Sequence, residues 1–343
     1  MNIDMHTSVF PGAEWEKIAP DEAGFDTKKL SLSKRWLDKN AKKRRYRIVV
    51  VRGGRIAAEW NQGVSSEERI FLASAAKSIF SCILGIAIKE GKLPSADARI
   101  IDYYPEAMEV PEGKGPKPGR YAFEKDAGIT FRHLISNTSG YMKPGEEPGR
   151  VFHYQTFGMN ILTHAIAKTY RLYDIRDPEG SPGLKKLIDE KLRIPIQARW
   201  TYSWMNFNLH PEAANHIFGY YDGVNATARD MARFGWLLCN EGRWREKEIV
   251  PVQWLREAIK TAPEIRKNCP SVQWKYGYGF WTNDNGRLWP GLPLDSFAAS
   301  GAGGRHIWVC PSLNLVVVQS PGLFKDQAEN DTGLLRYIVD ACK

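Results

Sequence analysis

Cysteine is scarce in this sequence and is not arranged to bind metal. The 343 residues include five cysteines, with no C-x-x-C pair and no histidine partner at the spacing of a zinc site. We therefore expect no metal site, and we expect free thiols in a reducing compartment. The five residues concerned are Cys82, Cys239, Cys269, Cys310 and Cys342.

Long hydrophobic runs and a leader segment are also missing. The longest apolar run, at residues 79–88, is interrupted by Ser81 and Gly85. It is shorter than the roughly 18 residues that a membrane-spanning helix needs. The start of the chain has no basic region followed by an apolar stretch, as a secretory signal would have. We therefore expect a cytoplasmic protein without a membrane span.

Three common enzyme motifs are absent as well. The sequence has no H-E-x-x-H of zinc proteases, no G-x-S-x-G of α/β-hydrolases and no glycine-rich phosphate loop. Nothing in it therefore supports a zinc-dependent or nucleotide-dependent reaction, and we expect no metal and no organic cofactor.

The composition that is present is typical of a globular protein. Hydrophobic residues make up 43%, aromatic residues 12% and charged residues 25% of the chain. The length fits one large domain or two closely packed ones.

The formal charge of +9 is concentrated in the basic stretch at residues 28–47. Such a stretch can bind nucleic acid, but Leu30, Leu32, Trp36 and Leu37 recur in it at helical spacing. We expect the solvated face of an amphipathic helix, and therefore no nucleic-acid partner.

Strands are indicated near both ends of the chain, and helices between them. Residues 46–60 are typical of a hairpin around Gly53 and Gly54, and residues 307–310 and 315–319 of antiparallel strands around a turn. Helical patterns cover residues 74–91, 129–141, 159–170, 183–192, 225–242 and 331–342.

This order predicts an α+β fold, an antiparallel β-sheet flanked by helices. Residues 1–70 and 220–343 would build the sheet domain from both termini, and residues 71–219 an inserted, mainly helical lobe. We expect the active site at the interface between them.

The motif Ser74-Ala75-Ala76-Lys77 carries the candidate chemistry. A serine hydroxyl needs a nearby base to become a nucleophile. Residues at i and i+3 share a helix face, so the Lys77 amine can reach the Ser74 oxygen. Desolvation at the start of an apolar helix would lower the pKa of Lys77 toward that of a useful base. A snorkelling lysine is the alternative, although its charge would oppose the helix dipole.

A second S-x-x-K motif occurs at Ser31 and Lys34. S-x-x-K alone is a weak signal, because a chain of this length should show about one by chance. The Ser31 motif lies in the basic, exposed-looking stretch, so we interpret it as fortuitous. Ser74 opens a helix that is apolar on nearly every face, which predicts a central, buried position.

Five blocks in order resemble the serine β-lactamase-like hydrolase superfamily. The similarity is to its class C-related branch: family VIII carboxylesterases, 6-aminohexanoate-oligomer hydrolases and D-peptidases. It implies a β-lactamase/transpeptidase-like fold and no cofactor. The blocks are residues 72–93, 129–141, 148–162, 222–244 and 297–318.

The resemblance assigns catalytic roles to three residues. Ser74 matches the nucleophile that forms the acyl-enzyme, and Lys77 its paired base. Tyr154 matches the tyrosine of the family's Y-x-N element, which shuttles the serine proton. The third position of that element is Thr156 here, not asparagine, so an amide contact to substrate is lost.

The family's K-T-G element is also altered. The matching residues are Ala299, Ser300 and Gly301, so the basic residue is missing. Arg305 or His306 could replace it as a carboxylate anchor. The resemblance further implies an oxyanion hole formed by the backbone N–H groups of Ser74 and Ala302.

The resemblance implies a serine hydrolase, and the missing lysine favours a carboxylesterase acting on small esters. The alternatives are an amide hydrolase of the 6-aminohexanoate type, a β-lactamase or D-peptidase, an acyltransferase and a non-catalytic binding module. Thr156, Ser300, Gly301 and Arg305 are the candidate substrate-binding residues, together with Trp204 in the aromatic-rich residues 198–208. Trp281 and Trp289 are weaker candidates for an apolar pocket.

Overall fold

A six-stranded antiparallel sheet is assembled from both ends of the chain. The computed structural model describes residues 8–206, 217–323 and 332–343. The strand order is β2-β1-β11-β10-β9-β8, so two early strands pair with four late ones and the predicted α+β fold is confirmed. The strands are β1 (Tyr46–Arg52), β2 (Arg55–Gln62), β8 (Trp281–Thr282), β9 (Phe297–Gly301), β10 (Arg305–Cys310) and β11 (Leu315–Gln319).

The central strands are buried along their whole length. Both β1 and β11 are runs of β-branched residues that suit a strand covered on both faces. Gly53 and Gly54 form the predicted two-residue turn between β1 and β2, with φ of 59° and 86°. Their positive φ angles explain why the turn consists of glycines.

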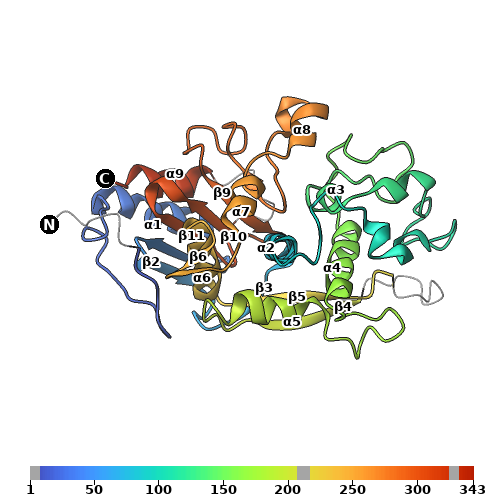
Figure 1. The fold of residues 1–343 in the computed structure, drawn as a ribbon. Coiled ribbons are helices and arrows are strands. Elements are labelled where there is room, and N and C mark those ends of the chain that lie inside the picture. The colour runs from blue at the N-terminus through green and yellow to red at the C-terminus, as the bar shows by residue number, and fades with distance from the viewer. Residues whose placement is uncertain (1–7, 207–216, 324–331) are drawn as a thin grey trace.

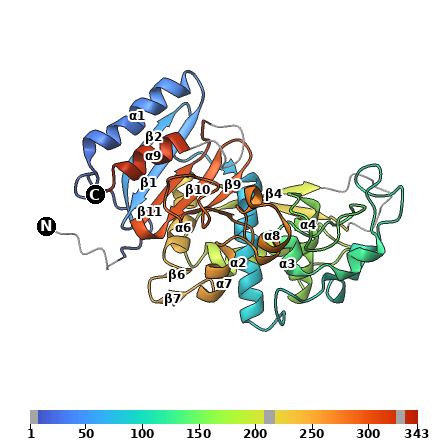
Figure 2. The same cartoon turned by 90° about the horizontal axis from the view of Figure 1, so that it is seen from above.

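Helices cover both faces of this sheet (Figures 1 and 2). The basic helix α1 (Thr27–Ala41) packs beside α9 (Thr332–Asp340) on one face, and α6 (Ala228–Cys239) lies on the other. Leu30 and Leu37 of α1 are buried, whereas Leu32 is exposed. The expected amphipathic helix is therefore confirmed. Asp331, at the start of the expected final helix, lies outside the described residues.

Helix α2 (Ala76–Lys89) runs between the main sheet and the helices α3 (Phe131–Ile135) and α4 (Phe157–Thr169) (Figures 1 and 2). Every residue from Ala76 to Ala87 is buried, as its apolar sequence predicts. In the part of the chain that the structure describes, no helix has the length and apolar character that crossing a bilayer requires. The other helices are α5 (Gly183–Ile188), α7 (Val252–Ala258) and α8 (Pro263–Asn268).

Two predicted helices end or begin elsewhere than expected. The helix predicted for residues 129–141 stops at Ile135, because Asn137 takes a left-handed φ of 58°. Residues 220–226, partly assigned to a helix, form a strand, and Thr227 caps the helix that follows by accepting a hydrogen bond from Asp230 N.

A smaller three-stranded sheet was not predicted from the sequence. It has the order β3 (Ile70–Phe71), β5 (Tyr220–Ala226) and β4 (Thr201–Asn206). Its strands come from distant parts of the chain, so their pairing depends on tertiary contacts. A two-stranded ribbon, β6 (Arg243–Trp244) and β7 (Lys247–Glu248), completes the strands of the described residues.

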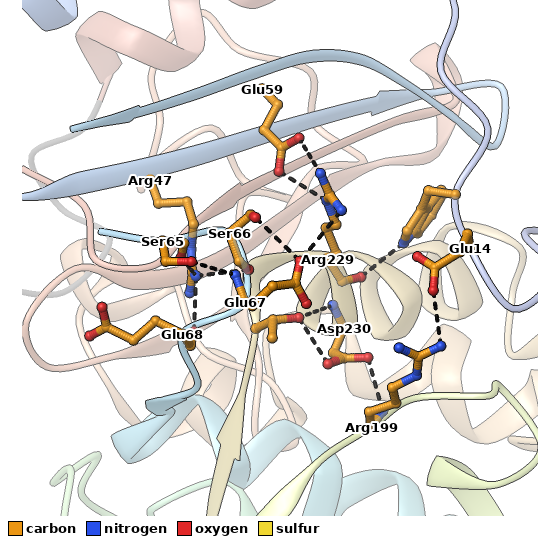
Figure 3. A network of polar contacts seen from close by, with 12 residues as sticks. Glu14, Arg47, Glu59, Ser65, Ser66, Glu67, Glu68, Arg199, Arg229 and Asp230 are labelled. Carbon is orange, nitrogen blue, oxygen red and sulfur yellow. Dashed lines mark hydrogen bonds and ion pairs between the residues drawn. The ribbon is translucent and has the colours of Figure 1, made fainter. Parts of the chain in front are cut away.

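A polar network fixes the segment that leads toward Ser74 (Figure 3). The guanidinium of buried Arg47, on β1, donates to the carbonyl oxygens of Ser65, Ser66 and Glu68. Its Nε donates to Ser320 O over 2.9 Å. These carbonyls compensate the desolvated cation and tie the segment before β3 to the main sheet.

Helix α6 is joined to the same region. Arg229 forms a bidentate ion pair with Glu59 of β2, at 3.0 and 2.8 Å, and approaches Glu67 at 3.6 Å. Asp230 accepts a hydrogen bond from Arg199 N (Figure 3). The main sheet, α6 and the chain preceding Ser74 are therefore held in one frame.

Candidate active site

Ser74 lies in the short connection between strand β3 of the small sheet and helix α2. Strand β3 ends at Phe71, and a 3₁₀ turn at Ala73–Ala75 leads directly into α2. Ala73 has a left-handed φ of 49°, a strained conformation that costs of order 1–3 kcal/mol and often marks functional sites. The turn leaves the Ser74 side chain partly exposed at the N-terminal end of a buried helix.

Lys77 contacts Ser74 as the spacing predicted. Its Nζ donates to Ser74 Oγ over 2.8 Å, and the lysine is only 1% exposed. When the amine is neutral, the same two atoms can exchange roles and the hydroxyl can donate. The distance places the amine within reach of the serine proton.

Burial alone lowers the pKa of Lys77 to about 7. Among the described residues no carboxylate forms an ion pair with Lys77, so no opposite charge offsets the cost of desolvating its ammonium group. Its position in the first turn of α2 acts in the same direction, because the helix N-terminus disfavours a cation. A substantial fraction of Lys77 is therefore neutral at neutral pH and able to accept a proton.

Tyr154 joins this pair from a segment far away in the chain. The Lys77 Nζ lies 4.6 Å from the centroid of its ring. Burial raises the pKa of Tyr154 to about 12, and a hydrogen bond with Ser74 offsets part of the rise. The phenol therefore stays protonated at neutral pH, which suits a proton donor.

Two aromatic side chains fix the Tyr154 ring. Trp281 stacks on it at 5.6 Å between centroids, and Tyr276 packs edge-on at 5.7 Å. Trp281, a weaker pocket candidate in the sequence, thus contacts the site. Trp289, the other weaker candidate, is instead buried in the core beside Trp308.

The end of β9 approaches the backbone of Ser74 closely. A Cβ added to Gly301 would lie 2.2 Å from Leu72 O, 2.9 Å from Ala75 N and 3.1 Å from Ser74 N. Only glycine allows this approach. Ala302 follows directly, so the two proposed oxyanion donors belong to adjoining backbone segments.

Ser300 and His306 face each other across β9 and β10. Ser300 Oγ and His306 Nδ1 are 2.9 Å apart, and both residues are buried. Burial lowers the pKa of His306 to about 4. His306 is thus neutral at neutral pH and offers no charge to a substrate carboxylate.

Arg305 lies instead against the turn that carries Ala302. Its Nη1 donates to Ala302 O over 2.7 Å. Of the two candidates for the missing lysine, Arg305 is therefore the cationic one and the one beside the proposed oxyanion hole.

The remaining sequence candidates lie in different surroundings. Thr156 is half-buried at the start of α4, and its carbonyl accepts from Met159 N. The ring of Trp204 lies 4.0 Å from Lys185 Nζ and lines a hollow beside α5 whose lining includes none of the three catalytic candidates. The structure therefore does not bring Trp204 together with them through that hollow. Residues 207 and 208 of the aromatic stretch lie outside the described residues.

The second S-x-x-K motif has ordinary surface contacts. Ser31 is exposed and donates to Lys28 O, and Lys34 forms an ion pair with Asp38. Both motifs are helical, so burial distinguishes them rather than spacing.

Sequence reasoning missed two residues beside this site: Ala73 precedes Ser74, and the backbone oxygen of Asn137 accepts a hydrogen bond from His153 N, next to Tyr154. The left-handed φ of Ala73 has no sequence signal, because alanine is not typical of that conformation. Asn137 has one, since asparagine tolerates left-handed φ and follows a helix here.

The arrangement can perform acyl transfer. It offers a nucleophile, a base with a lowered pKa, a protonated phenol and backbone N–H groups nearby. Among residues 8–206, 217–323 and 332–343, no three His, Cys, Asp or Glu side chains are grouped to hold a metal ion.

Known proteins resemble this chain over most of its length. The family model described as Beta-lactamase matches residues 44–331. The 6-aminohexanoate-dimer hydrolase of Paenarthrobacter ureafaciens is 22% identical over 294 residues, covering 79% of this chain and 71% of that protein. A putative β-lactamase from Bacteroides dorei DSM 17855 has a TM-score of 0.66 at 16% identity, covering 93% and 99% of the two chains. A family VIII carboxylesterase has a TM-score of 0.66 at 15% identity, covering 96% and 98%.

Proposed function

This chain belongs to the β-lactamase family, and from that premise we propose that it is a serine hydrolase acting on small carboxylic esters through an acyl-enzyme on Ser74. One observation carries the proposal. The Lys77 amine lies 2.8 Å from Ser74 Oγ and has a pKa of about 7.

Acylation begins with attack of Ser74 Oγ on the ester carbonyl carbon. Neutral Lys77 accepts the hydroxyl proton as the new C–O bond forms. The N–H groups of Ser74 and Ala302 stabilise the resulting oxyanion. The ester C–O bond then breaks, and the leaving alkoxide takes a proton from Tyr154, which recovers one from Lys77.

Deacylation repeats these steps with water as nucleophile. Lys77 accepts a proton from the water as it attacks the acyl carbon. Collapse of the second tetrahedral intermediate returns the proton to Ser74 Oγ and releases the carboxylic acid. Every step uses side chains and backbone groups of this chain.

Two features favour esters over substrates that carry a carboxylate beside the reacting bond. Ala299 stands where the family has the K-T-G lysine, and the Ser300 hydroxyl is engaged by His306. The likeness to a family VIII carboxylesterase is in keeping with this choice.

Amide hydrolysis is the second candidate. Its support is the sequence match to a 6-aminohexanoate-dimer hydrolase, at 22% identity over 79% of this chain. An amide places a greater demand on the proton donor, because the leaving amine must be protonated as it departs.

The test compares p-nitrophenyl esters from acetate to octanoate with the linear dimer of 6-aminohexanoate and a chromogenic cephalosporin. We expect the short esters to be turned over, and a serine-directed fluorophosphonate to label a peptide containing Ser74. Turnover of the dimer alone would favour the amidase. Turnover of the cephalosporin alone would refute the ester choice and make Arg305 the suspected carboxylate anchor.

The pH dependence of ester turnover should reflect the pKa of Lys77. We expect kcat/KM to rise tenfold per pH unit below pH 7 and to level off above it, because the base is active only when neutral. His306, with a pKa of about 4, is already neutral in this range. The measurement is kcat/KM for p-nitrophenyl acetate between pH 5 and 10. The His306→Gln variant should show the same rise below pH 7. A flat profile between pH 5 and 10, or a rise that disappears in that variant, would contradict the role given to Lys77.

A further inference from the structure

Tyr154 is held from both sides by a single residue. His153 N donates to the backbone oxygen of Asn137 over 2.9 Å. Gln155 N donates to the side-chain Oδ1 of the same asparagine, also over 2.9 Å. The amide groups that flank Tyr154 are therefore both fixed to Asn137.

Asn137 is suited to this double contact by its conformation. Its left-handed φ of 58° turns the chain after α3 so that backbone and side-chain oxygens reach the same neighbouring segment. It is 1% exposed, and its own N–H donates to Leu134 O over 3.1 Å. Asparagine tolerates this φ better than most residues, and its amide supplies the acceptor.

The same frame continues to the helix that carries Lys77. Ile135, at the end of α3, accepts a hydrogen bond from Gly279 N over 3.0 Å. Gly279 O in turn accepts from Ser78 Oγ over 2.6 Å, and Ser78 is next to Lys77 on α2. Hydrogen bonds through Gly279 therefore connect α2 beside Lys77 with the end of α3, two residues before Asn137.

We propose that Asn137 is a positioning residue for the reaction: by holding the amides on either side of Tyr154, it sets where the phenol hydroxyl lies relative to Ser74. This inference rests on the proposed function. Asn137 acts only through Tyr154, and its side-chain Oδ1 is the atom that matters.

A double-mutant cycle tests whether Asn137 acts through Tyr154. Asn137→Gly keeps the left-handed φ and the backbone oxygen but removes Oδ1, leaving Gln155 N–H unpaired. The readouts are the rate of Ser74 labelling by a fluorophosphonate and kcat for p-nitrophenyl acetate. Both are compared in wild type, Asn137→Gly, Tyr154→Phe and the double variant.

We expect Asn137→Gly to lower both rates about 10-fold or more in the wild-type background, with KM little changed. In the Tyr154→Phe background the loss should be less than about threefold, because the group being positioned is gone. Equal losses in both backgrounds would show a merely structural role and overturn the inference, as would an unchanged rate in Asn137→Gly.

Two further variants keep the test decisive. Ser139→Ala removes the 2.9 Å bond from Gln155 Nε2 between the same segments, without touching the amides beside Tyr154, and should leave both rates nearly unchanged. Asn137→Asp keeps an acceptor at Oδ1 and should label within about threefold of wild type. If Asn137→Gly does not fold, a labelling loss of 10-fold or more in folded Asn137→Asp overturns the inference.

The wild type separates the two possible failures. If wild-type Ser74 takes no label and turns over no ester or amide, the proposed function fails and the positioning role falls with it. If wild type reacts and the cycle shows no coupling, only the role of Asn137 is wrong.

Discussion

Replacing Ser74 by alanine or Lys77 by methionine is expected to abolish ester turnover almost completely. Removing the nucleophile should lower kcat by about 10⁴-fold or more, and removing its base by about 10³-fold. The double variant should be little worse than Ser74→Ala, because the two groups act as one unit. The measurement is turnover of p-nitrophenyl acetate, corrected for spontaneous hydrolysis.

The second S-x-x-K motif supplies a matched control. Ser31→Ala and Lys34→Met change the same residue types in the same spacing, on an exposed helix where Lys34 pairs with Asp38. Both should keep wild-type activity. If they lower turnover as much as changes at Ser74 and Lys77 do, the assignment of the nucleophile is wrong.

Lys77→Met should also stabilise the protein while it inactivates it. Lys77 is buried, and its pKa falls from the usual 10.5 to about 7 on folding. Below pH 7 the folded protein carries the whole cost of a buried cation. Between pH 7 and 10.5 the unfolded chain binds a proton that the folded one does not, so that cost fades as pH rises.

The thermal midpoint of Lys77→Met should therefore lie above that of wild type at pH 6, and the difference should narrow by pH 9. Methionine fills a similar volume without a charge, so the helix should stay packed. A variant that is inactive and less stable at pH 6 would indicate that Lys77 supports the fold rather than the chemistry.

Gly301→Ala is expected to have the second large effect. The added methyl group would lie 2.2 Å from Leu72 O and within 3.1 Å of Ser74 N, so either β9 or the turn at Ser74 has to move. Both are backbone segments, and displacing either of them is energetically costly. Misplacing an oxyanion donor costs about 10²–10³-fold in kcat, and we expect a loss of that size.

Gly128→Ala is the control for this change. A Cβ there meets nothing within 4 Å, and the residue does not have a positive φ. Its activity and thermal midpoint should match those of wild type. Steady-state kinetics and circular dichroism on both variants distinguish a displaced oxyanion hole from a failure to fold. Full activity in Gly301→Ala would show that the close approach is not needed for catalysis.

Much of the secondary structure followed from local patterns. Three local patterns each favour one type of secondary structure, and the structure has the elements that they predict. They are the two glycines of the β1–β2 turn, the apolar run of α2 and the β-branched runs of β1 and β11. The small sheet was missed because its strands pair across the chain. The end of α3 was missed because one asparagine took a left-handed conformation.

The sequence by itself determined that Ser74 and Lys77 lie side by side. A spacing of three residues at a helix start places an amine beside a hydroxyl, because the helix repeats every 3.6 residues whatever surrounds it. The order of strands and helices along the chain determined which segments could form one sheet. The ordered blocks of the sequence determined the family.

Only the tertiary structure decided the surroundings of that pair. The exposed motif at Ser31 has the same spacing as the one at Ser74, yet only Lys77 is desolvated, because distant segments cover it. Three other contacts likewise join segments that are far apart in the sequence, so spacing could not predict them. They are the position of Tyr154 beside Lys77, the hydrogen bond between Gln155 and Asn137, and the close approach of Gly301 to Ser74. Helix periodicity fixes distances between near neighbours, whereas packing alone fixes the distances and the burial that tune this site.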